Sequence, residues 1–353
     1  MRGQLSTTAV VTRNRPGDQP IIRLRNVSKQ FVKRRSWDQL LRHPMRREFI
    51  SALSDVSIDI NRGEFFGLLG QNGAGKTTLF KTLATLVLPD SGSASVGAFD
   101  VVSDPHRVRA MLTPVIAEER SLFWRLSAVE NLRLFAALYG LKGTTGINRA
   151  QEVLDTVGLG DTGEKLVGAF SSGMKQRLLI GRALLARSEV LLLDEPTRSL
   201  DPLAARDFRH FLRTELVDKH GYTVLLATHN AEEALELCDR VSVLHKGRLL
   251  AVGTVDELVV TAGRDTYRFT AKKELEASLN GLLESGEIHA LKSATGVDES
   301  WMEFELQMQG GLTEASNLLA RLVATGIPVA EFERVDLALP DLLERILADA
   351  ENA

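Results

Sequence analysis

Residues 70–78 constrain the fold of this chain more than any other stretch, because they read Gly-Gln-Asn-Gly-Ala-Gly-Lys-Thr-Thr. They match the phosphate-binding pattern G-x-x-x-x-G-K-[ST], in which glycines allow consecutive backbone N–H groups to point at phosphate oxygens. Lys76 supplies a positive charge for the β and γ oxygens, and Thr77 offers a hydroxyl to Mg²⁺. Such a loop joins a buried strand to a helix whose N-terminus faces the anion. We therefore expect a strand over 65–69 and a helix over 77–86.

A glycine-rich turn without a ligand is the alternative for this stretch, and the rest of the sequence decides between the two. The apolar runs 190–193 and 223–226 are separated by a helical pattern over 204–217, which is typical of a parallel sheet with crossover helices. Residues 21–25 alternate like an edge strand, and 54–60 repeat the alternation, which indicates an added antiparallel layer. Between 127 and 157 the pattern becomes helical and predicts an inserted helical subdomain over about 124–180.

The length of 353 residues is sufficient for two domains. Residues 1–19 are polar and lack the apolar core of a secretion signal, so we expect a disordered tail. Residues 20–259 then form a nucleotide-binding domain, and 260–353 change to mixed strands and helices. The predicted fold class is α/β: a P-loop core with a parallel sheet, an antiparallel layer and a helical insertion, plus a small C-terminal α+β domain.

Charge is distributed unevenly although the formal net charge is only −3. Residues 1–50 carry twelve Lys and Arg against three acidic residues, whereas 260–353 carry eight against seventeen. The basic arm, including an amphipathic stretch at 34–49, suits nucleic acid or an anionic membrane surface, or is a solvated face. No run approaches the roughly 18 apolar residues of a membrane span. The single Cys238 excludes an internal disulfide and a multi-cysteine metal site, which favours a cytosolic protein.

Two carboxylates follow the apolar run 190–193, at the end of the strand where a parallel sheet presents its ligand site. Asp194 is placed to hold Mg²⁺ and Glu195 to polarise the water that attacks the γ-phosphate. Alone, an Asp-Glu pair after a strand is more often a helix cap, but the phosphate loop reverses that preference.

Two further polar motifs lie nearby in the predicted topology. Ser171, Ser172 and Gly173 open a helix and offer a donor-rich N-terminus for a second phosphate contact, with plain helix capping as the equal alternative. His229 follows the strand that ends at 227–228, so it reaches the same sheet edge and can bond the γ-phosphate or the attacking water.

Five motifs follow one another in a fixed order within residues 20–258. They are the phosphate loop, the Ser-Ser-Gly-Met helix start, the Asp-Glu strand end, Ser199-Leu200-Asp201 and Thr228-His229. In this order and spacing the chain resembles the ATPase subunit of ATP-binding cassette (ABC) transporters.

This resemblance implies the roles of individual residues. Phe31 stacks on adenine, and two copies of the chain pair head to tail around two ATP molecules. Ser171, Ser172, Gly173 and Asp201 of one copy then cover the ATP that the other copy holds. His229 acts as the switch histidine beside the catalytic Glu195. The residues of the phosphate loop that hold ATP are Gly70, Asn72, Gly73, Ala74, Gly75, Lys76, Thr77 and Thr78.

The sequence departs from the family pattern at two places. The family carries a glutamine near the end of the strand at Val115, whereas this chain offers Glu118, which can ligate Mg²⁺ beside Thr77 and Asp194 but cannot donate a hydrogen bond. The usual Leu-Ser-Gly-Gly-Gln becomes Phe-Ser-Ser-Gly-Met at 170–174, a form similar to exporters of drugs, glycolipids and polysaccharides whose permease is a separate chain.

The resemblance implies the ATP-binding and ATP-hydrolysing subunit of a bacterial ABC exporter, with ATP and Mg²⁺ as cofactors. As a homodimer on the cytoplasmic face of the inner membrane, it powers export of a drug, lipid or glycan through a separate permease. No nucleic-acid partner is expected. The alternative is a soluble ABC ATPase that acts on ribosomes or nucleic acid, which the basic arm would serve. Such proteins usually carry two cassettes, a long coiled-coil insertion or zinc-binding cysteines, and this sequence has none of these.

Overall fold

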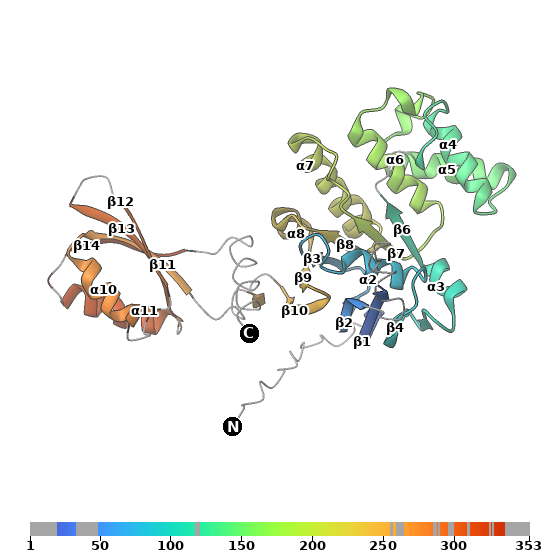
Figure 1. The fold of residues 1–353 in the computed structure, drawn as a ribbon. Helices are drawn as coiled ribbons and strands as arrows, with labels where there is room; N and C mark the ends of the chain where they lie inside the picture. The colour runs from blue at the N-terminus through green and yellow to red at the C-terminus, as the bar shows by residue number, and fades with distance from the viewer. Residues whose placement is uncertain are drawn as a thin grey trace, which may run out of the picture. The chain divides into compact units, whose positions relative to one another are not determined.

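The chain forms two compact units, Met1–Leu249 and Leu250–Ala353, in a computed structural model. Each unit is described by itself (Figure 1). The division falls inside the last strand of the first sheet, so the predicted boundary between 259 and 260 stays a prediction. The predicted tail at 1–19 lies outside the described residues, which are 20–32, 49–116, 121–254, 257–258, 265–284, 288, 290–295, 300–308, 311–324, 326 and 328–335.

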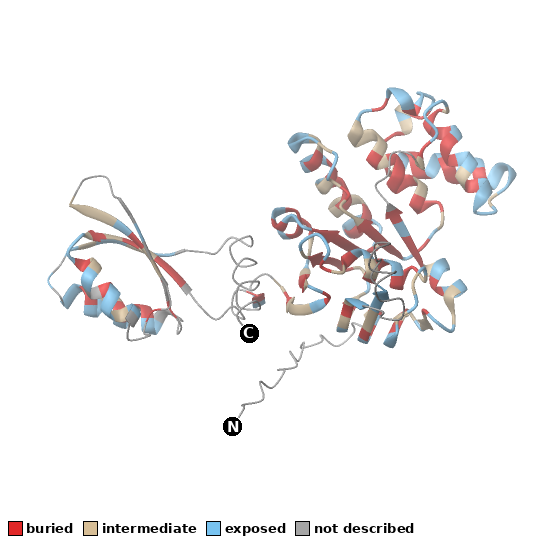
Figure 2. Ribbon diagram, in the orientation of Figure 1, coloured by how far each residue is buried: buried red, intermediate tan, exposed pale blue. Residues whose placement is uncertain are grey.

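A six-stranded sheet forms the centre of the first unit, in the order β10-β9-β3-β8-β7-β6. The pairs β9/β3, β3/β8, β8/β7 and β7/β6 are parallel. Figure 2 shows buried residues along these strands and exposed residues on the outer sides of the helices. A strand covered on both faces must be apolar throughout, which explains the continuous runs in the sequence. The strands are β3 (Phe65–Leu69), β6 (Leu112–Ile116), β7 (Val190–Asp194), β8 (Thr223–Thr228), β9 (Arg240–His245) and β10 (Arg248–Gly253).

The predicted antiparallel layer is a second sheet in the order β2-β1-β4-β5. Its strands are β1 (Pro20–Val32), β2 (Phe49–Asn61), β4 (Ser91–Val96) and β5 (Phe99–Asp100). The expectation of an edge strand at 21–25 is wrong, because β1 pairs with β2 on one side and with β4 on the other. Alternation in sequence tells which face of a strand is buried but not how many neighbours it has.

Helices cover the parallel sheet and build the inserted block. The helix after the phosphate loop begins at Lys76 and ends at Leu83, three residues before the predicted end. The inserted block contains α4, α5 and α6, which pack on one another beyond β6 (Figure 1). The helices are α2 (Lys76–Leu83), α3 (Pro105–Met111), α4 (Ala128–Leu138), α5 (Gly143–Thr156), α6 (Ser172–Leu184), α7 (Pro202–Phe211) and α8 (Ala231–Leu237), with short 3₁₀ turns at Gly160–Thr162 and Val167–Ala169 and a π-helical segment at Leu212–Lys219.

The second unit is a four-stranded antiparallel sheet with two helices, in the order β12-β13-β11-β14. This chain order of strand, helix, two strands, helix and strand is the split βαβ arrangement, and it confirms the predicted α+β class. Phe304, Phe269 and Phe332 form a row across the sheet, with ring centroids 5.6 Å apart in both neighbouring pairs. The predicted helix from 340 lies outside the described residues. The elements are β11 (Asp265–Lys272), α10 (Leu275–Glu284), β12 (Ala290–Thr295), β13 (Trp301–Met308), α11 (Gly311–Ala324) and β14 (Val329–Val335).

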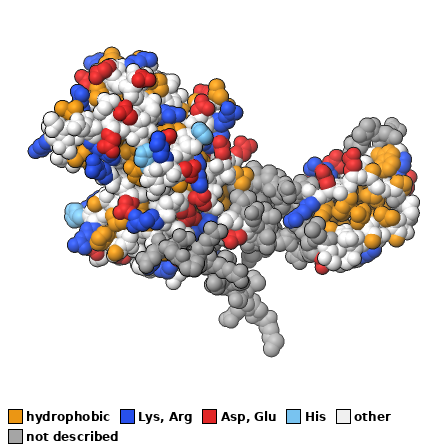
Figure 3. Space-filling view, turned by 180° about the vertical axis from the view of Figure 1, so that it is seen from behind, with side chains coloured by type: hydrophobic (Ala, Val, Ile, Leu, Met, Phe, Trp, Pro, Cys, Tyr) orange, Lys and Arg blue, Asp and Glu red, His pale blue; other side chains and the backbone are white. Residues whose placement is uncertain are grey.

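On the face shown in Figure 3, hydrophobic side chains of this second unit gather next to acidic ones, whereas basic and acidic side chains are interspersed over the first unit. Within the part of the chain that the structure describes, no helix combines the length and the apolar character needed to cross a membrane.

Candidate functional site

The phosphate loop connects the buried strand β3 to helix α2, as its sequence predicts. A Cβ atom at Gly75 would lie 2.4 Å from the carbonyl oxygen of Ala52, and the φ angle of Gly75 is +113°. A Cβ atom at Gly70 would lie 2.4 Å from the carbonyl oxygen of Leu244. Gly73 has open space around it but a φ of +84°. Gly70 and Gly75 are therefore required because another backbone segment approaches each of them closely. Gly73 and Gly75 also adopt a left-handed backbone conformation that favours glycine.

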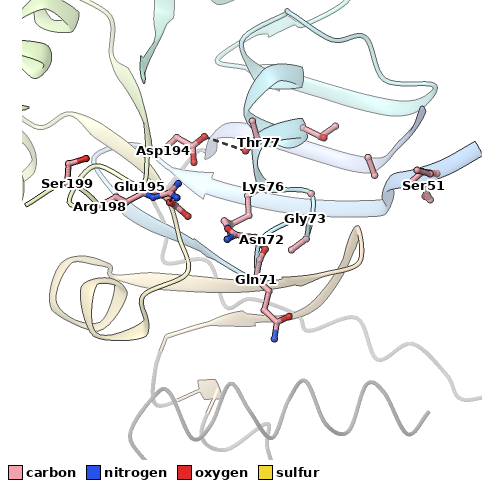
Figure 4. A pocket seen from close by; sticks show the side chains of 15 residues that line it. Ser51, Gln71, Asn72, Gly73, Lys76, Thr77, Asp194, Glu195, Arg198 and Ser199 are labelled. Atoms are coloured by element: carbon pink, nitrogen blue, oxygen red, sulfur yellow. Dashed lines mark hydrogen bonds and ion pairs between the residues drawn. The ribbon is translucent and has the colours of Figure 1, made fainter. Parts of the chain in front are cut away.

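A pocket of ≈ 420 Å³ opens above this loop (Figure 4). Its volume lies within the range of ligand sites in proteins. The loop, the end of β7 and the start of β2 supply its walls, and its side chains are mostly polar. The lining residues are Ile50, Ser51, Ala52, Gln71, Asn72, Gly73, Ala74, Gly75, Lys76, Thr77, Thr78, Asp194, Glu195, Arg198 and Ser199.

Lys76 is 6% exposed and its ammonium donates hydrogen bonds to the carbonyl oxygens of Gly70 and Gln71. Burial lowers the pKa of Lys76, whereas the negative charges of Glu195 and Asp194 act to raise it. Lys76 at the start of α2 and the free N–H groups of the first helical turn face the pocket together. This end of the pocket is therefore suited to a polyphosphate.

Asp194 ends β7 beside Thr77, whose hydroxyl lies 3.4 Å from the carboxylate (Figure 4). Burial raises the pKa of Asp194, and the neighbouring charge of Glu195 raises it further, against the opposing effects of Lys76 and Thr77. A half-buried carboxylate next to a hydroxyl offers oxygen ligands of the kind that Mg²⁺ prefers. Thr77 and Asp194 thus fit the predicted metal role, whereas Glu118 lies outside the described residues.

Glu195 stands next to Asp194 but has different partners. Its Oε1 lies 2.8 Å from Nδ1 of His229, and its Oε2 lies 3.2 Å from Arg198. The side chain of Glu195 is 14% exposed, and its backbone φ is +47°, a left-handed value that non-glycine residues adopt at a cost. The parallel register pairs Asp194 with Ala227, which brings His229 to the same edge of the sheet. Glu195 therefore lines the pocket, and His229 contacts it at the same edge of the sheet, as the sequence predicts, without lining the pocket itself.

The other predicted ATP contacts do not line this pocket. Ser171 caps α6, since its hydroxyl accepts a hydrogen bond from the Met174 N–H at 3.3 Å, and Ser172 and Gly173 form the first turn. Asp201 caps α7 by accepting from Ala204 N–H at 2.9 Å.

Phe31 lies at the end of β1, where its ring is 42% exposed and has the Lys29 ammonium 5.6 Å from its centroid. The roles proposed for these residues stay predictions.

Several of the lining residues were not identified from the sequence: Ile50, Ser51, Ala52, Gln71 and Arg198. Arg198 is three residues after Glu195, a spacing that places it within reach of that carboxylate. Ser51 and Ala52 belong to β2, which precedes the loop and β3 in the sequence, and no local pattern connects them to the loop. Their position follows from the hydrogen bond between Ser54 N–H and the carbonyl of Gly247, which holds β2 against the β9–β10 turn.

Comparison with known proteins adds sequence and fold relationships. The profile of a family described as ABC transporter matches residues 53–198. The protein NatA of Bacillus subtilis, an ABC transporter ATP-binding protein, is 36% identical over 60% of this chain and 86% of its own length. A daunorubicin resistance ATP-binding protein, DrrA3 of Streptomyces coeruleorubidus, is 42% identical over 61% of this chain and 67% of its own. The linearmycin resistance ATP-binding protein LnrL of B. subtilis is 32% identical over 76% of this chain and 83% of its own length.

Solved structures show the same fold. The ATP-binding cassette MJ0796, seen as a dimer with ADP and Pi, has a TM-score of 0.54 and 25% identity over 66% of this chain and 98% of its own. The cbiO1 protein of Clostridium perfringens has a TM-score of 0.59 and 24% identity over 76% of this chain and 99% of its own.

Proposed function

This chain belongs to the family of ABC transporter ATP-binding proteins, and on that premise we propose that it hydrolyses ATP to drive export through a separate membrane permease. The observation that carries the proposal is the meeting of Lys76, Thr77, Asp194 and Glu195 at one pocket, with His229 in contact with Glu195. Lys76 and the N-terminus of α2 hold the phosphates, and Thr77 and Asp194 hold Mg²⁺. Glu195 orients and polarises the attacking water, while His229 fixes the carboxylate.

We propose a drug as the exported substrate, within the predicted class of drugs, lipids and glycans. Two relatives are named for resistance to daunorubicin and linearmycin, and this supports the narrower class. The dimer described for the related cassette bound to ADP and Pi supports a homodimer, which we propose to be head to tail. In the proposed homodimer, residues 171–173 of one copy cover the open pocket of the other copy. The assembly is expected at the cytoplasmic face of the inner membrane.

The permease contact is assigned to an apolar patch on the inserted block. Phe123, Trp124 and Leu134 are 50%, 55% and 38% exposed and line an open pocket of ≈ 640 Å³ together with Leu122, Arg125 and Leu126. Large aromatic side chains that remain exposed together are typical of protein interfaces. Because the patch is formed by the turns between β6 and α4 and by Leu134 on α4, movement of this block on ATP binding would reach the permease.

Recovery with a membrane partner tests this function. The full chain, purified from its own host in detergent, should retain an integral membrane protein, and Trp124→Ala should reduce that recovery about tenfold or more. Leu138→Ala is the matched control, since Leu138 is 74% exposed on α4 but does not line the pocket. Equal recovery with Trp124→Ala, or recovery with nucleic acid at moderate salt instead, would contradict the assignment.

A further inference from the structure

A second polar pocket, of ≈ 440 Å³, lies at the opposite end of the six-stranded sheet from the phosphate loop. The loop follows the end of β3, whereas this pocket is lined by residues that precede β3, β7 and β8 and by one turn of α5. Its lining brings together Arg62, Arg149, Glu152, the segment 187–189 and the segment 220–223. None of these residues lines the nucleotide pocket.

Two buried groups at this pocket lack hydrogen-bond partners among the described residues. Ser188 is 2% exposed and its hydroxyl is unpaired, and the Nε of Arg149 is also unpaired. The side chain of Arg149 is only 9% exposed, and its other nitrogens bond Glu152 at 2.7 Å and the carbonyl oxygen of Leu184. A buried donor without an acceptor is unfavourable, because it has lost its hydrogen bonds to water and gained none in the protein. Both groups can donate, so a ligand with acceptor oxygens would remove this cost.

The charge around the pocket is positive once its ion pairs are counted. Arg149 pairs with Glu152, and Arg62 pairs with Glu189, so both nearby carboxylates are already engaged. Arg187 is exposed, and its side chain forms no hydrogen bond or ion pair with any described residue. Its backbone φ is +52°, a left-handed value for a residue with a side chain. Such strained residues occur at ligand sites, where the surrounding structure holds them in place.

From these observations we infer that this pocket binds a phosphate-type anion, either inorganic phosphate or a small phosphate ester. The uncommitted groups are donors from Arg149 on α5 and from the neighbouring residues Arg187 and Ser188 before β7, so an oxyanion could accept from two segments of the chain. The volume exceeds that of phosphate alone and leaves room for a small organic group. Because Arg149 belongs to α5 and Ser188 precedes β7, the anion ties the inserted block to the sheet.

Calorimetric titration of the full chain with inorganic phosphate tests the site. The titration uses the Lys76→Ala background, because phosphate also binds the nucleotide loop. We expect binding to persist there and to weaken about tenfold with Arg187→Ala, which removes a charge but no existing contact. Ser188→Ala should weaken it several-fold. Arg133→Ala, an exposed arginine on α4, is the control and should leave phosphate affinity unchanged.

The outcomes separate the sources of the anion. Tighter binding of glycerol 3-phosphate than of phosphate, with the same loss on Arg187→Ala, identifies a phosphate ester. Equal affinity for the two identifies free phosphate. The proposal is overturned if phosphate binding disappears with Lys76→Ala in a protein that still melts cooperatively, or if Arg187→Ala binds phosphate as tightly as its background.

Discussion

Asp194 and Glu195 are adjacent in the chain, but the structure gives them different chemistry. Asp194 faces Thr77 and the buried Lys76, whereas Glu195 turns to His229 through its left-handed backbone. The reversal of direction between consecutive residues allows one carboxylate to serve a metal and the other to serve water. A φ near +47° at Glu195 is thus part of how the site is built.

The raised pKa of Asp194 predicts how the folding stability of the protein depends on pH. Burial and the charge of Glu195 disfavour the ionised carboxylate, so the folded protein binds this proton more tightly than the unfolded chain does. Stability is therefore lost as the pH rises through the raised pKa. We expect Asp194→Asn to raise the midpoint of urea unfolding at about pH 7, while abolishing Mg²⁺-dependent ATP hydrolysis, and this gain should shrink toward about pH 4.5.

Asp90→Asn is the matched control, because the pKa of Asp90 is shifted in the opposite direction from that of Asp194. The hydrogen bond from Lys29 and the Gln30 N–H lower the pKa of Asp90, so its contribution is present at neutral pH and lost as the pH falls. Asp90→Asn should lower the unfolding midpoint at neutral pH. A lower midpoint for Asp194→Asn at neutral pH would refute the electrostatic account of the site.

At the residue scale, sequence reasoning reached the groups that chemistry demands in a fixed order, such as Lys76, Asp194 and His229. It did not reach Ala52, whose carbonyl oxygen explains why residue 75 has to be glycine. A motif specifies its own residue types, but the groups that approach it from distant strands depend on tertiary packing. The unpaired Ser188 is invisible in the sequence for the same reason.

At the scale of elements, helix ends carry much of the predicted site. Ser171 caps α6 and Asp201 caps α7 within one chain, which is the capping alternative weighed from the sequence. Capping does not exclude a contact with a second copy's ATP, because a hydroxyl can accept from the backbone and donate outward. The two roles can be separated by substitution.

Ser171→Asn keeps a good helix cap but removes the hydroxyl. We expect the free energy of unfolding to stay within about 0.5 kcal/mol of wild type, while ATP hydrolysis at high protein concentration falls about tenfold or more. Ser127→Ala is the counterpart, because Ser127 and Glu130 form a capping box on α4. This substitution should lower the free energy of unfolding by about 1 kcal/mol and leave the rate of ATP hydrolysis unchanged. Urea unfolding and steady-state ATPase assays measure both. If Ser171→Asn hydrolysed ATP at the wild-type rate, Ser171 would have only the capping role and no contact with the ATP of a second copy.

The elements themselves were predictable where one pattern decides them. The apolar runs of β7 and β8 fixed a buried parallel pair, and the turn at Lys246 and Gly247 fixed the β9–β10 hairpin. The interior position of β1 was missed because its second neighbour, β4, lies about 70 residues further along and is rich in serine. The π-helical segment Leu212–Lys219 continues α7 with no marker in its sequence.

At the scale of the whole molecule, one chain contains only part of the proposed machine. Residues 171–173 and Asp201 do not line the pocket that holds Lys76 and Glu195. The second unit has a core of its own around Phe269 and Phe304, so it does not depend on the nucleotide pocket for its fold. In the proposed homodimer, a second copy would supply these residues and complete the ATP site.

Dependence of hydrolysis on protein concentration tests this arrangement. We expect the rate per molecule to rise with concentration and to level off once dimers form. Glu195→Gln should lower the turnover rate by about 10²-fold or more, because the amide cannot take a proton from the attacking water. It should still bind ATP and double the mass measured by light scattering. Glu232→Gln is the matched control, since Glu232 is an exposed carboxylate on α8 that does not line the pocket, and it should leave the turnover rate unchanged. A rate per molecule that stays constant at high dilution would show that one chain hydrolyses ATP without its partner's cover.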